Sequence, residues 1–270
     1  MTATITPVSD RTLTAHASAA QALRDTLTMA WRSLLRVRRT PEQWADVILQ
    51  PVIFTVMFAF LFGGAIAGDV GSYLPTLIPG ILVQTVITTS VVTGVQLRED
   101  MDTGVFDRFR TLPIARIAPL AGALLADTLR YAVATAMTFV VGMAIGYRPA
   151  GGVVGVLLAG LLVVACSWAI SWIFALLGVV SRSATTVQSL SFLVLFPLTF
   201  LSNAFVPIET LPSWLRWFAT ANPVSHLISG TRALANGTQA TGDVTIALLG
   251  AAVVVAVFAP LTVHAYMRKA

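Results

Sequence analysis

Charged side chains gather in the segment 97–116, LREDMDTGVFDRFRTLPIAR, which separates two long apolar segments. Apolar residues recur within it at steps of four, four and three, namely Met101, Val105, Phe109 and Leu112. Those steps predict an amphipathic helix over residues 101–112, with carboxylates and guanidinium groups on its opposite side. Such a helix can insert a phenylalanine into an apolar groove of a partner protein while its charges select the rim of that groove. The alternative is a surface helix that lies against lipid headgroups.

The remaining reactive side chains do not form a pattern typical of catalysis, cofactor binding or metal binding. A phosphate-binding loop needs GxxxxGK followed by Ser or Thr, and the only lysine is Lys269, next to the end of the sequence. The histidines, His16, His226 and His264, are isolated from one another. The single cysteine, Cys166, lies in an apolar run, which is typical of a small buried residue. We therefore expect this chain to bind no cofactor and no metal, and not to be an enzyme by itself.

One acidic and one basic residue fall inside an apolar segment. Asp127 and Arg130 are three residues apart, so they share a helix face and can neutralise one another. A charged residue at the centre of a membrane helix costs about 2.5–3.5 kcal/mol, which favours keeping the two together. The pair either orients its helix within a bundle or lines a transport route or a subunit interface. A proton relay is not expected, because a close arginine discourages protonation of the aspartate.

The composition places these residues in an all-α membrane protein. Apolar residues make up 56% of the chain, charged residues only 11%, and the mean hydropathy is +0.82. Windows of about 20 apolar residues are long enough to cross the hydrocarbon core as helices. Six such spans are predicted, near residues 46–67, 74–96, 119–147, 152–180, 187–206 and 244–266. A β-barrel would need shorter segments of alternating apolar and polar residues, whereas these runs are continuous.

A polar segment, residues 1–45, precedes the six-span domain of residues 46–270 and carries several arginines. Apolar residues recur within it at helical spacing, namely Leu23, Leu27, Trp31 and Leu34. We expect an amphipathic helix lying in the headgroup region and ending at Pro41, which makes an elbow before the first span. The alternative is a disordered basic tail that only sets the orientation of the chain.

The distribution of Lys and Arg predicts the orientation. The polar start has no short apolar centre typical of a cleavable signal peptide, so the N-terminus is expected to stay in the cytoplasm. Six spans then place most basic residues on the cytoplasmic side and leave only Arg148, Arg216 and Arg232 outside. Both termini are therefore expected in the cytoplasm. A nucleic-acid partner is not expected, because the arginines are spread over separate loops and tails, where they suit anionic membrane lipids.

Three sequence motifs resemble those of one family of bacterial membrane proteins. The charged loop has an acidic start, then Gly104 and the run DRFRTLP at residues 107–113. Further along, LSNAFVPIETLPSW at 201–214 is followed by ANPVSHLISGTRAL at 221–234. Together with the six-span layout and the length, these runs resemble the daunorubicin and doxorubicin resistance permease family of type 2 ABC permeases. The resemblance covers nearly the whole chain.

The resemblance implies a membrane subunit of an ATP-driven exporter for a hydrophobic or amphipathic compound, such as a drug or antibiotic. The location implied is the bacterial cytoplasmic membrane. Two copies of a P-loop ATPase subunit would bind ATP and Mg, and a second permease, identical or different, would complete the transport route. The nearer alternative is a type 2 permease for a lipid or lipid-linked polysaccharide. The more distant one is an ion-coupled secondary transporter, a class that often contains internal repeats, of which we see none that is clear.

The same resemblance implies roles for two groups of residues. The amphipathic helix would dock on the ATPase and transmit its closure. The residues expected at this coupling site are Glu99, Met101, Gly104, Val105, Asp107, Arg108, Phe109, Arg110, Leu112 and Pro113. The segment after Pro207 resembles short re-entrant helices that cap the route on the outer side. The residues expected at this outer gate are Asn203, Pro207, Pro212, Trp214, Asn222, Pro223 and Arg232.

Overall fold

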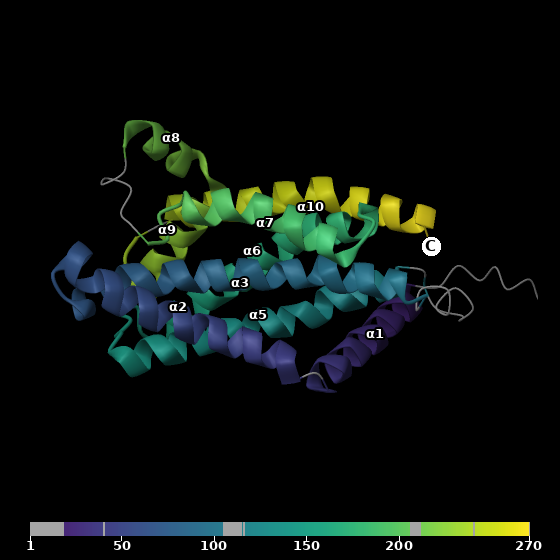
Figure 1. Cartoon of the computed structure of the whole chain (residues 1–270), viewed down its shortest axis with the longest axis horizontal. Helices are drawn as coiled ribbons and strands as arrows, with labels where there is room; N and C mark the ends of the chain where they lie inside the picture. The colour runs from purple at the N-terminus through teal and green to yellow at the C-terminus, as the bar shows by residue number, and fades with distance from the viewer. Residues whose placement is uncertain are drawn as a thin grey trace, which may run out of the picture.

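Helices make up every regular element of the chain that the structure describes. The computed structural model describes residues 19–39, 41–104, 115, 117–205, 212–239 and 241–269. Figure 1 shows the helices within these ranges. They are α1 (Ala19–Arg39), α2 (Pro41–Ala67), α3 (Val70–Asp102), α5 (Ala118–Ile145), α6 (Gly152–Val180), α7 (Ala184–Phe200), α8 (Ser213–Ala221), α9 (Pro223–Asn236) and α10 (Thr241–Lys269). The predicted all-α class is confirmed for this part of the chain.

Five of these helices are long and apolar enough to cross a membrane: α2 over Ile48–Ala67, and α3, α5, α6 and α10 over their full lengths. The boundaries of α5 and α6 lie within two residues of those predicted. The fifth predicted span corresponds to α7, which has only 17 residues. At 1.5 Å per residue, α7 is about 25 Å long, a little shorter than the roughly 30 Å hydrocarbon core.

The fifth predicted span, 187–206, extends too far, because α7 ends at Phe200. Local hydrogen bonds replace the helical pattern directly after it. The Ser202 hydroxyl donates to the Thr199 carbonyl oxygen at 2.5 Å and accepts from the Ala204 N–H at 3.2 Å. Serine commonly ends helices in this way, by bonding to nearby backbone groups.

The core of the bundle forms around α3, which contacts α2, α5, α6, α7 and α9. Large apolar residues of α3, including Leu74, Leu77 and Ile81, are almost completely buried. Two glycines bring α3 and α6 together: a Cβ at Gly94 would lie 2.2 Å from the Phe174 carbonyl oxygen. A Cβ at Gly178 would lie 2.4 Å from the Gly94 carbonyl oxygen, so neither position tolerates a side chain without moving the helices.

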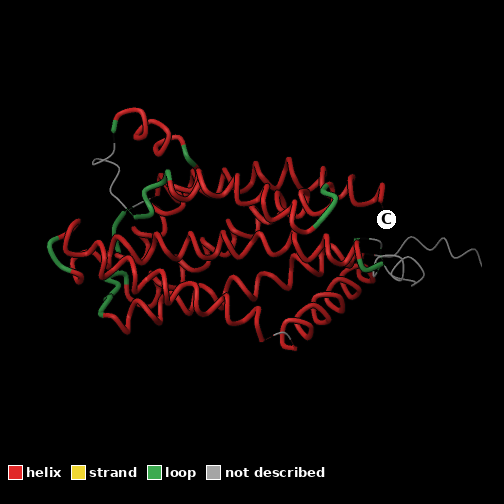
Figure 2. The backbone as a smooth tube through the Cα atoms, in the orientation of Figure 1, coloured by secondary structure: helices red, strands yellow, loops and turns green. Residues whose placement is uncertain are grey.

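The connections between helices gather at two opposite ends of the bundle (Figure 2). We call one the charged end; it contains the end of α3, the start of α5, the α6–α7 turn and the C-terminus (Figure 1). We call the other the α8 end; it contains the α2–α3 turn, the α5–α6 turn, α8 and the start of α10. This alternation agrees with the predicted order of connections.

The N-terminal helix, α1, lies beside α5 and turns sharply into α2 (Figure 1). It ends at Arg39, and α2 begins at Pro41, the residue at which the sequence predicted an elbow. Its small residue Ala30 is buried where α5 presents Gly122, since a Cβ at Gly122 would meet Met29 and Ala30 at 2.5–2.9 Å. Leu23, Leu27 and Trp31 of the predicted apolar row stay exposed, as expected of a helix that also contacts lipid, whereas Leu34 is partly buried.

Candidate functional site

The charged segment begins on α3 rather than on a separate helix. The sequence suggested that a loop starts at Leu97 and that a new helix starts at Met101, but α3 continues to Asp102. No proline or glycine occurs between Leu97 and Gly104, and Leu97 is buried against a cluster that includes Trp172 and Tyr266, with Met101 packed beside it. Thr103 and Gly104 then form a turn in which Gly104 has φ +68°, a conformation that favours glycine. The predicted helix over 101–112 is therefore wrong at its first residues.

Of the predicted coupling residues, Glu99, Met101 and Gly104 lie at this end of α3. The Glu99 side chain is exposed, and its carbonyl oxygen accepts from the Thr103 N–H at 3.0 Å. The other predicted coupling residues lie outside the described residues: Val105, Asp107, Arg108, Phe109, Arg110, Leu112 and Pro113. The chain is described again at Ala115, whose N–H donates to Asp25 of α1 at 2.9 Å. Helix α1 thus holds the backbone that leads into α5, a contact between residues 90 positions apart that no local pattern predicts.

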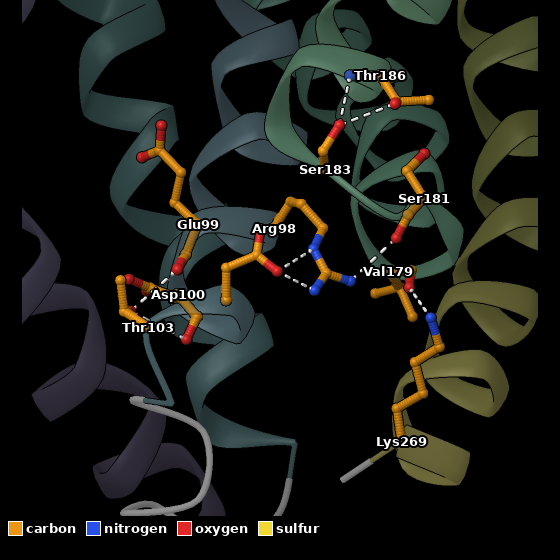
Figure 3. A network of polar contacts seen from close by, with 10 residues as sticks. Arg98, Glu99, Asp100, Thr103, Val179, Ser181, Ser183, Thr186 and Lys269 are labelled. Carbon is orange, nitrogen blue, oxygen red and sulfur yellow. Dashed lines mark hydrogen bonds and ion pairs between the residues drawn. The ribbon is translucent and has the colours of Figure 1, made fainter.

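Two basic residues satisfy the C-terminal carbonyl groups of α6 at the charged end (Figure 3). Arg98, at the end of α3, donates to the Ser181 carbonyl oxygen at 2.9 Å and forms an ion pair with Asp102 one turn on. Lys269, at the end of α10, donates to the Val179 carbonyl oxygen at 2.6 Å. Cations at a helix C-terminus complement its unbonded carbonyl groups and its dipole. The contacts fasten the ends of α3, α6 and α10 together beside the charged segment.

The predicted ion pair between Asp127 and Arg130 is present within α5. Asp127 Oδ1 lies 2.9 Å from Arg130 Nη1, and each residue is only 3% exposed. Both partners also bond to α3: Thr93 Oγ1 donates to Asp127 Oδ2 at 2.5 Å, and Arg130 Nη2 donates to Gln96 Oε1 at 3.0 Å. The bonds favour the first predicted role, in which the pair fixes its helix within the bundle.

The network of Asp127, Arg130, Thr93 and Gln96 joins the two helices that flank the charged segment. Thr93 precedes the end of α3 by nine residues, and Asp127 follows the start of α5 by nine residues. At 1.5 Å per residue, both lie about 14 Å from the charged end. The network therefore joins α3 and α5 at positions that lie equally far from the charged end.

At the α8 end, polar side chains bind α9 to the core. Arg232 Nη2 donates to the carbonyl oxygens of Thr76 on α3 and of Asn203 at 3.0 and 2.9 Å. Asn203 is buried and donates to the Ser229 hydroxyl at 2.8 Å. Asn222 caps α9 by accepting from the Val224 N–H at 2.9 Å, and it donates to the Leu198 carbonyl oxygen of α7 at 2.7 Å. We call this set of contacts the outer cap.

The outer cap includes residues that the sequence did not single out. Asn236 Nδ2 donates to the Pro75 carbonyl oxygen at 3.0 Å, and its Oδ1 accepts from the Tyr147 hydroxyl at 2.8 Å. The Pro75 carbonyl oxygen has no backbone partner within α3, because Pro79, four residues on, has no N–H. Burial raises the pKa of Tyr147, which follows α5, to about 12, so its hydroxyl remains a donor at neutral pH. The paired prolines Pro75 and Pro79 were the only local signal of this bond.

The predicted outer gate divides into two parts in the structure. Asn203, Asn222, Pro223 and Arg232 all belong to the outer cap or to the start of α9 beside it. Trp214 instead lies on α8 and is 71% exposed, with Pro212 directly before the helix. Pro207 lies outside the described residues. The exposed face of α8 suits contact with a membrane interface better than contact with the cap.

The remaining residues considered in the sequence, Cys166 and His226 among them, take part in local contacts. Cys166 is buried within α6, and its thiol lies 3.8 Å from the Ala247 carbonyl oxygen. His226 Nδ1 lies 2.8 Å from Asp243, and Nε2 lies 3.0 Å from the Thr220 carbonyl oxygen. Within the described residues, no group of three acidic, histidine or cysteine side chains could hold a metal ion.

These elements define a multi-pass helical membrane protein, and comparison with known proteins gives its family. The sequence matches the ABC-2 type transporter family over residues 24–235, so the chain belongs to that family. It is 44% identical over 250 residues to the daunorubicin resistance ABC transporter permease protein DrrB1 of Streptomyces coeruleorubidus, covering 93% of this chain and 88% of that one. It is 26% identical over 143 residues to the probable doxorubicin resistance ABC transporter permease protein DrrC of Mycobacterium tuberculosis, covering 53% and 51% of the two chains.

Proposed function

We propose that this chain is the transmembrane permease subunit of an ABC exporter that moves a hydrophobic or amphipathic compound, such as a drug or antibiotic, out of a bacterial cell. The observation that carries the proposal is the 44% identity with a daunorubicin resistance permease across 93% of the chain. Membership of the ABC-2 family implies a separate ATPase as partner. ATP and Mg would bind to that partner, in two copies, and this chain would provide the membrane route with a second permease subunit.

Force from the ATPase would enter at the charged end. The exposed Glu99 and the charged residues after Gly104 would contact the ATPase, with Phe109 inserted into its groove. Closure of the ATPase would then move α3 and α5 together, because the Asp127–Arg130 network joins them about 14 Å from that end. Rigid elements held by such bonds are able to carry a displacement across a membrane domain.

The orientation proposed places the charged end, with both termini, in the cytoplasm. Its support is the positive-inside distribution of Arg and Lys, including Arg98, Arg268 and Lys269 at this end. In this arrangement α7 is the fifth of six spans, and a helix of about 25 Å crosses with slight thinning of the bilayer. Residues 1–45 form the cytoplasmic segment with the elbow helix, and α8 and α9 cap the route outside.

The experiment that tests this function uses the chain together with its ATPase in inverted membrane vesicles. We expect ATP-dependent accumulation of daunorubicin, measured by the quenching of its fluorescence. Phe109→Ala is expected to lower transport at least tenfold while leaving the amount of inserted permease unchanged. Phe106→Ala is the matched control, because residue 106 falls outside the predicted apolar row, and it should transport normally.

Two outcomes would contradict parts of the proposal. Equal transport by Phe109→Ala and Phe106→Ala would show that the predicted row does not couple the subunits. Accumulation that continues without ATP and follows an ion gradient would instead support a secondary transporter.

A further inference from the structure

A cavity of about 350 Å³ lies between α6, α7, α9 and α10, with Ile87 of α3 at one side. All side chains that line it are apolar, and apart from Phe174 and the Cys166 thiol they are aliphatic. The wall residues used below are Leu195 and Val194 of α7, Leu227 of α9, and Ala251 and Val253 of α10. Its volume falls within the range of about 300–1,000 Å³ that is usual for small-molecule pockets.

The cavity lies within the membrane part of the bundle and reaches its surface. Cys166 lies midway along α6, about 21 Å from either end at 1.5 Å per residue. Val194 and Val253 line the cavity but are also 39% and 62% exposed, so the opening lies between α7 and α10. Pro223 and Leu227 of α9 line it toward the α8 end.

The chemistry of the wall limits what can fill the cavity. A water molecule needs two to four polar partners, and apolar cavities of this kind stay dry. A void left empty would deprive its wall of dispersion contacts. Drug-sized ligands with polar groups are usually oriented by a few polar side chains, of which this wall has none. A flexible hydrocarbon chain fits all three conditions, and lipid acyl chains surround the opening.

We infer that this cavity is a binding site for one acyl chain of a membrane phospholipid, separate from the route of the exported compound. The chain enters between α7 and α10, and its headgroup lies toward the α8 end. There α8, which ends two residues before Pro223, exposes Trp214 and Trp217, the residue type enriched at headgroup level. The site would hold α7 and α10 at a fixed separation.

Residues of α10 allow a matched test. Ala251 lines the cavity, whereas its neighbour Ala252 is exposed and does not. Ala251→Phe is expected to fill the cavity, and Ala252→Phe places the same side chain in the surrounding lipid. Gly250→Leu is a second filling variant: a Cβ there would meet only Pro223 Cβ, at 3.8 Å, so no backbone has to move. Leucine is also favoured over glycine in a helix.

The measurement uses the permease–ATPase complex in vesicles that contain phosphatidylglycerol with a diazirine in one acyl chain. After irradiation, adducts are mapped by proteolysis and mass spectrometry. We expect adducts near Cys166 and Leu195 in the parent protein and in Ala252→Phe, and at least a fivefold loss in Ala251→Phe and Gly250→Leu. Adducts on the exposed face of α2, which contains Phe60 and Leu61, should stay unchanged in all four.

Three results would overturn the inference. The first is equal labelling near Cys166 in all four proteins. The second is no labelling there in any of them, as expected if another protein subunit covers the opening. The third is loss of that labelling when daunorubicin is added in excess, which would assign the cavity to the exported compound.

Discussion

The two ends of the bundle are held by different kinds of contact. At the α8 end, Arg232 and Asn236 reach between elements and bond to carbonyl oxygens of α3 that lie more than 150 residues away in the sequence. At the charged end, Arg98 and Lys269 bond to the last carbonyl groups of α6 from neighbouring helix ends. The outer cap therefore joins elements distant in the sequence and includes the buried residues Asn203 and Asn222, whereas the charged end joins neighbouring helix termini through partly buried bonds.

The two kinds of contact indicate which end of the bundle can move when the ATPase closes. Charge interactions at partly exposed helix termini are screened and individually weak, so helix ends can shift at modest cost. Buried polar bonds are costly to leave unmade, so the outer cap resists movement. The Asp127–Arg130 network lies between the two ends and is more completely buried than Arg232 and Asn236 of the cap, so we expect it to link α3 and α5 strongly.

Breaking the buried ion pair should have the largest effect. Asp127→Ala leaves the Arg130 charge without its carboxylate partner in the bundle, which typically costs about 3–5 kcal/mol. We expect a large fall in the thermal stability of the detergent-purified complex and loss of transport. The double variant Asp127→Leu with Arg130→Met should be more stable than Asp127→Ala, since it leaves no unpaired charge. If Asp127→Ala melts at the same temperature as the parent, the network does not hold α3 to α5.

Loosening the outer cap should have an intermediate effect. Arg232→Met removes two partly buried bonds to carbonyl oxygens, and bonds to charged groups contribute about 1.5–3 kcal/mol each at most. We expect a loss of about 2 kcal/mol, measured as an earlier melting temperature of the complex. Trp214→Ala, on the exposed face of α8, should change stability by less than about 0.5 kcal/mol. Equal effects of the two substitutions would show that the cap is no more tightly held than α8.

The sequence alone predicts the parts of this fold that depend on local pattern. Apolar windows located the long helices, and the three-residue spacing of Asp127 and Arg130 predicted their contact. The partners of that pair on α3 could not be predicted, because Thr93 and Gln96 look like ordinary polar residues of an apolar helix. The length of α3 was missed for a related reason: tertiary packing of Met101 extends a helix that hydropathy ends earlier.

The candidate sites were predictable to different degrees. The outer gate motif contained the residues of the outer cap, but nothing local showed that Arg232 bonds to α3 while Trp214 points elsewhere. Asn236 and Tyr147 were missed because the contacts that give them a role join residues 89 and 161 positions apart. Long-range hydrogen bonds of this kind have no periodic signature, so only the three-dimensional arrangement shows them.

The smallest expected effect concerns the α2–α3 turn, an exposed connection of the α8 end. Asp69 caps α3 by accepting from the Ser72 N–H at 3.0 Å, and the bonds from the Ser72 hydroxyl and N–H hold the pKa of its carboxyl below the usual 3.8. A lowered pKa in the folded state contributes stability above the unfolded pKa, which is lost as the pH falls through the folded value. Amide exchange at Ser72 and Tyr73 should therefore speed up only in strong acid. Asp69→Asn keeps a capping oxygen without a titrating group, so its exchange should lack this acid step; an identical step in that variant would assign the pH dependence to another residue.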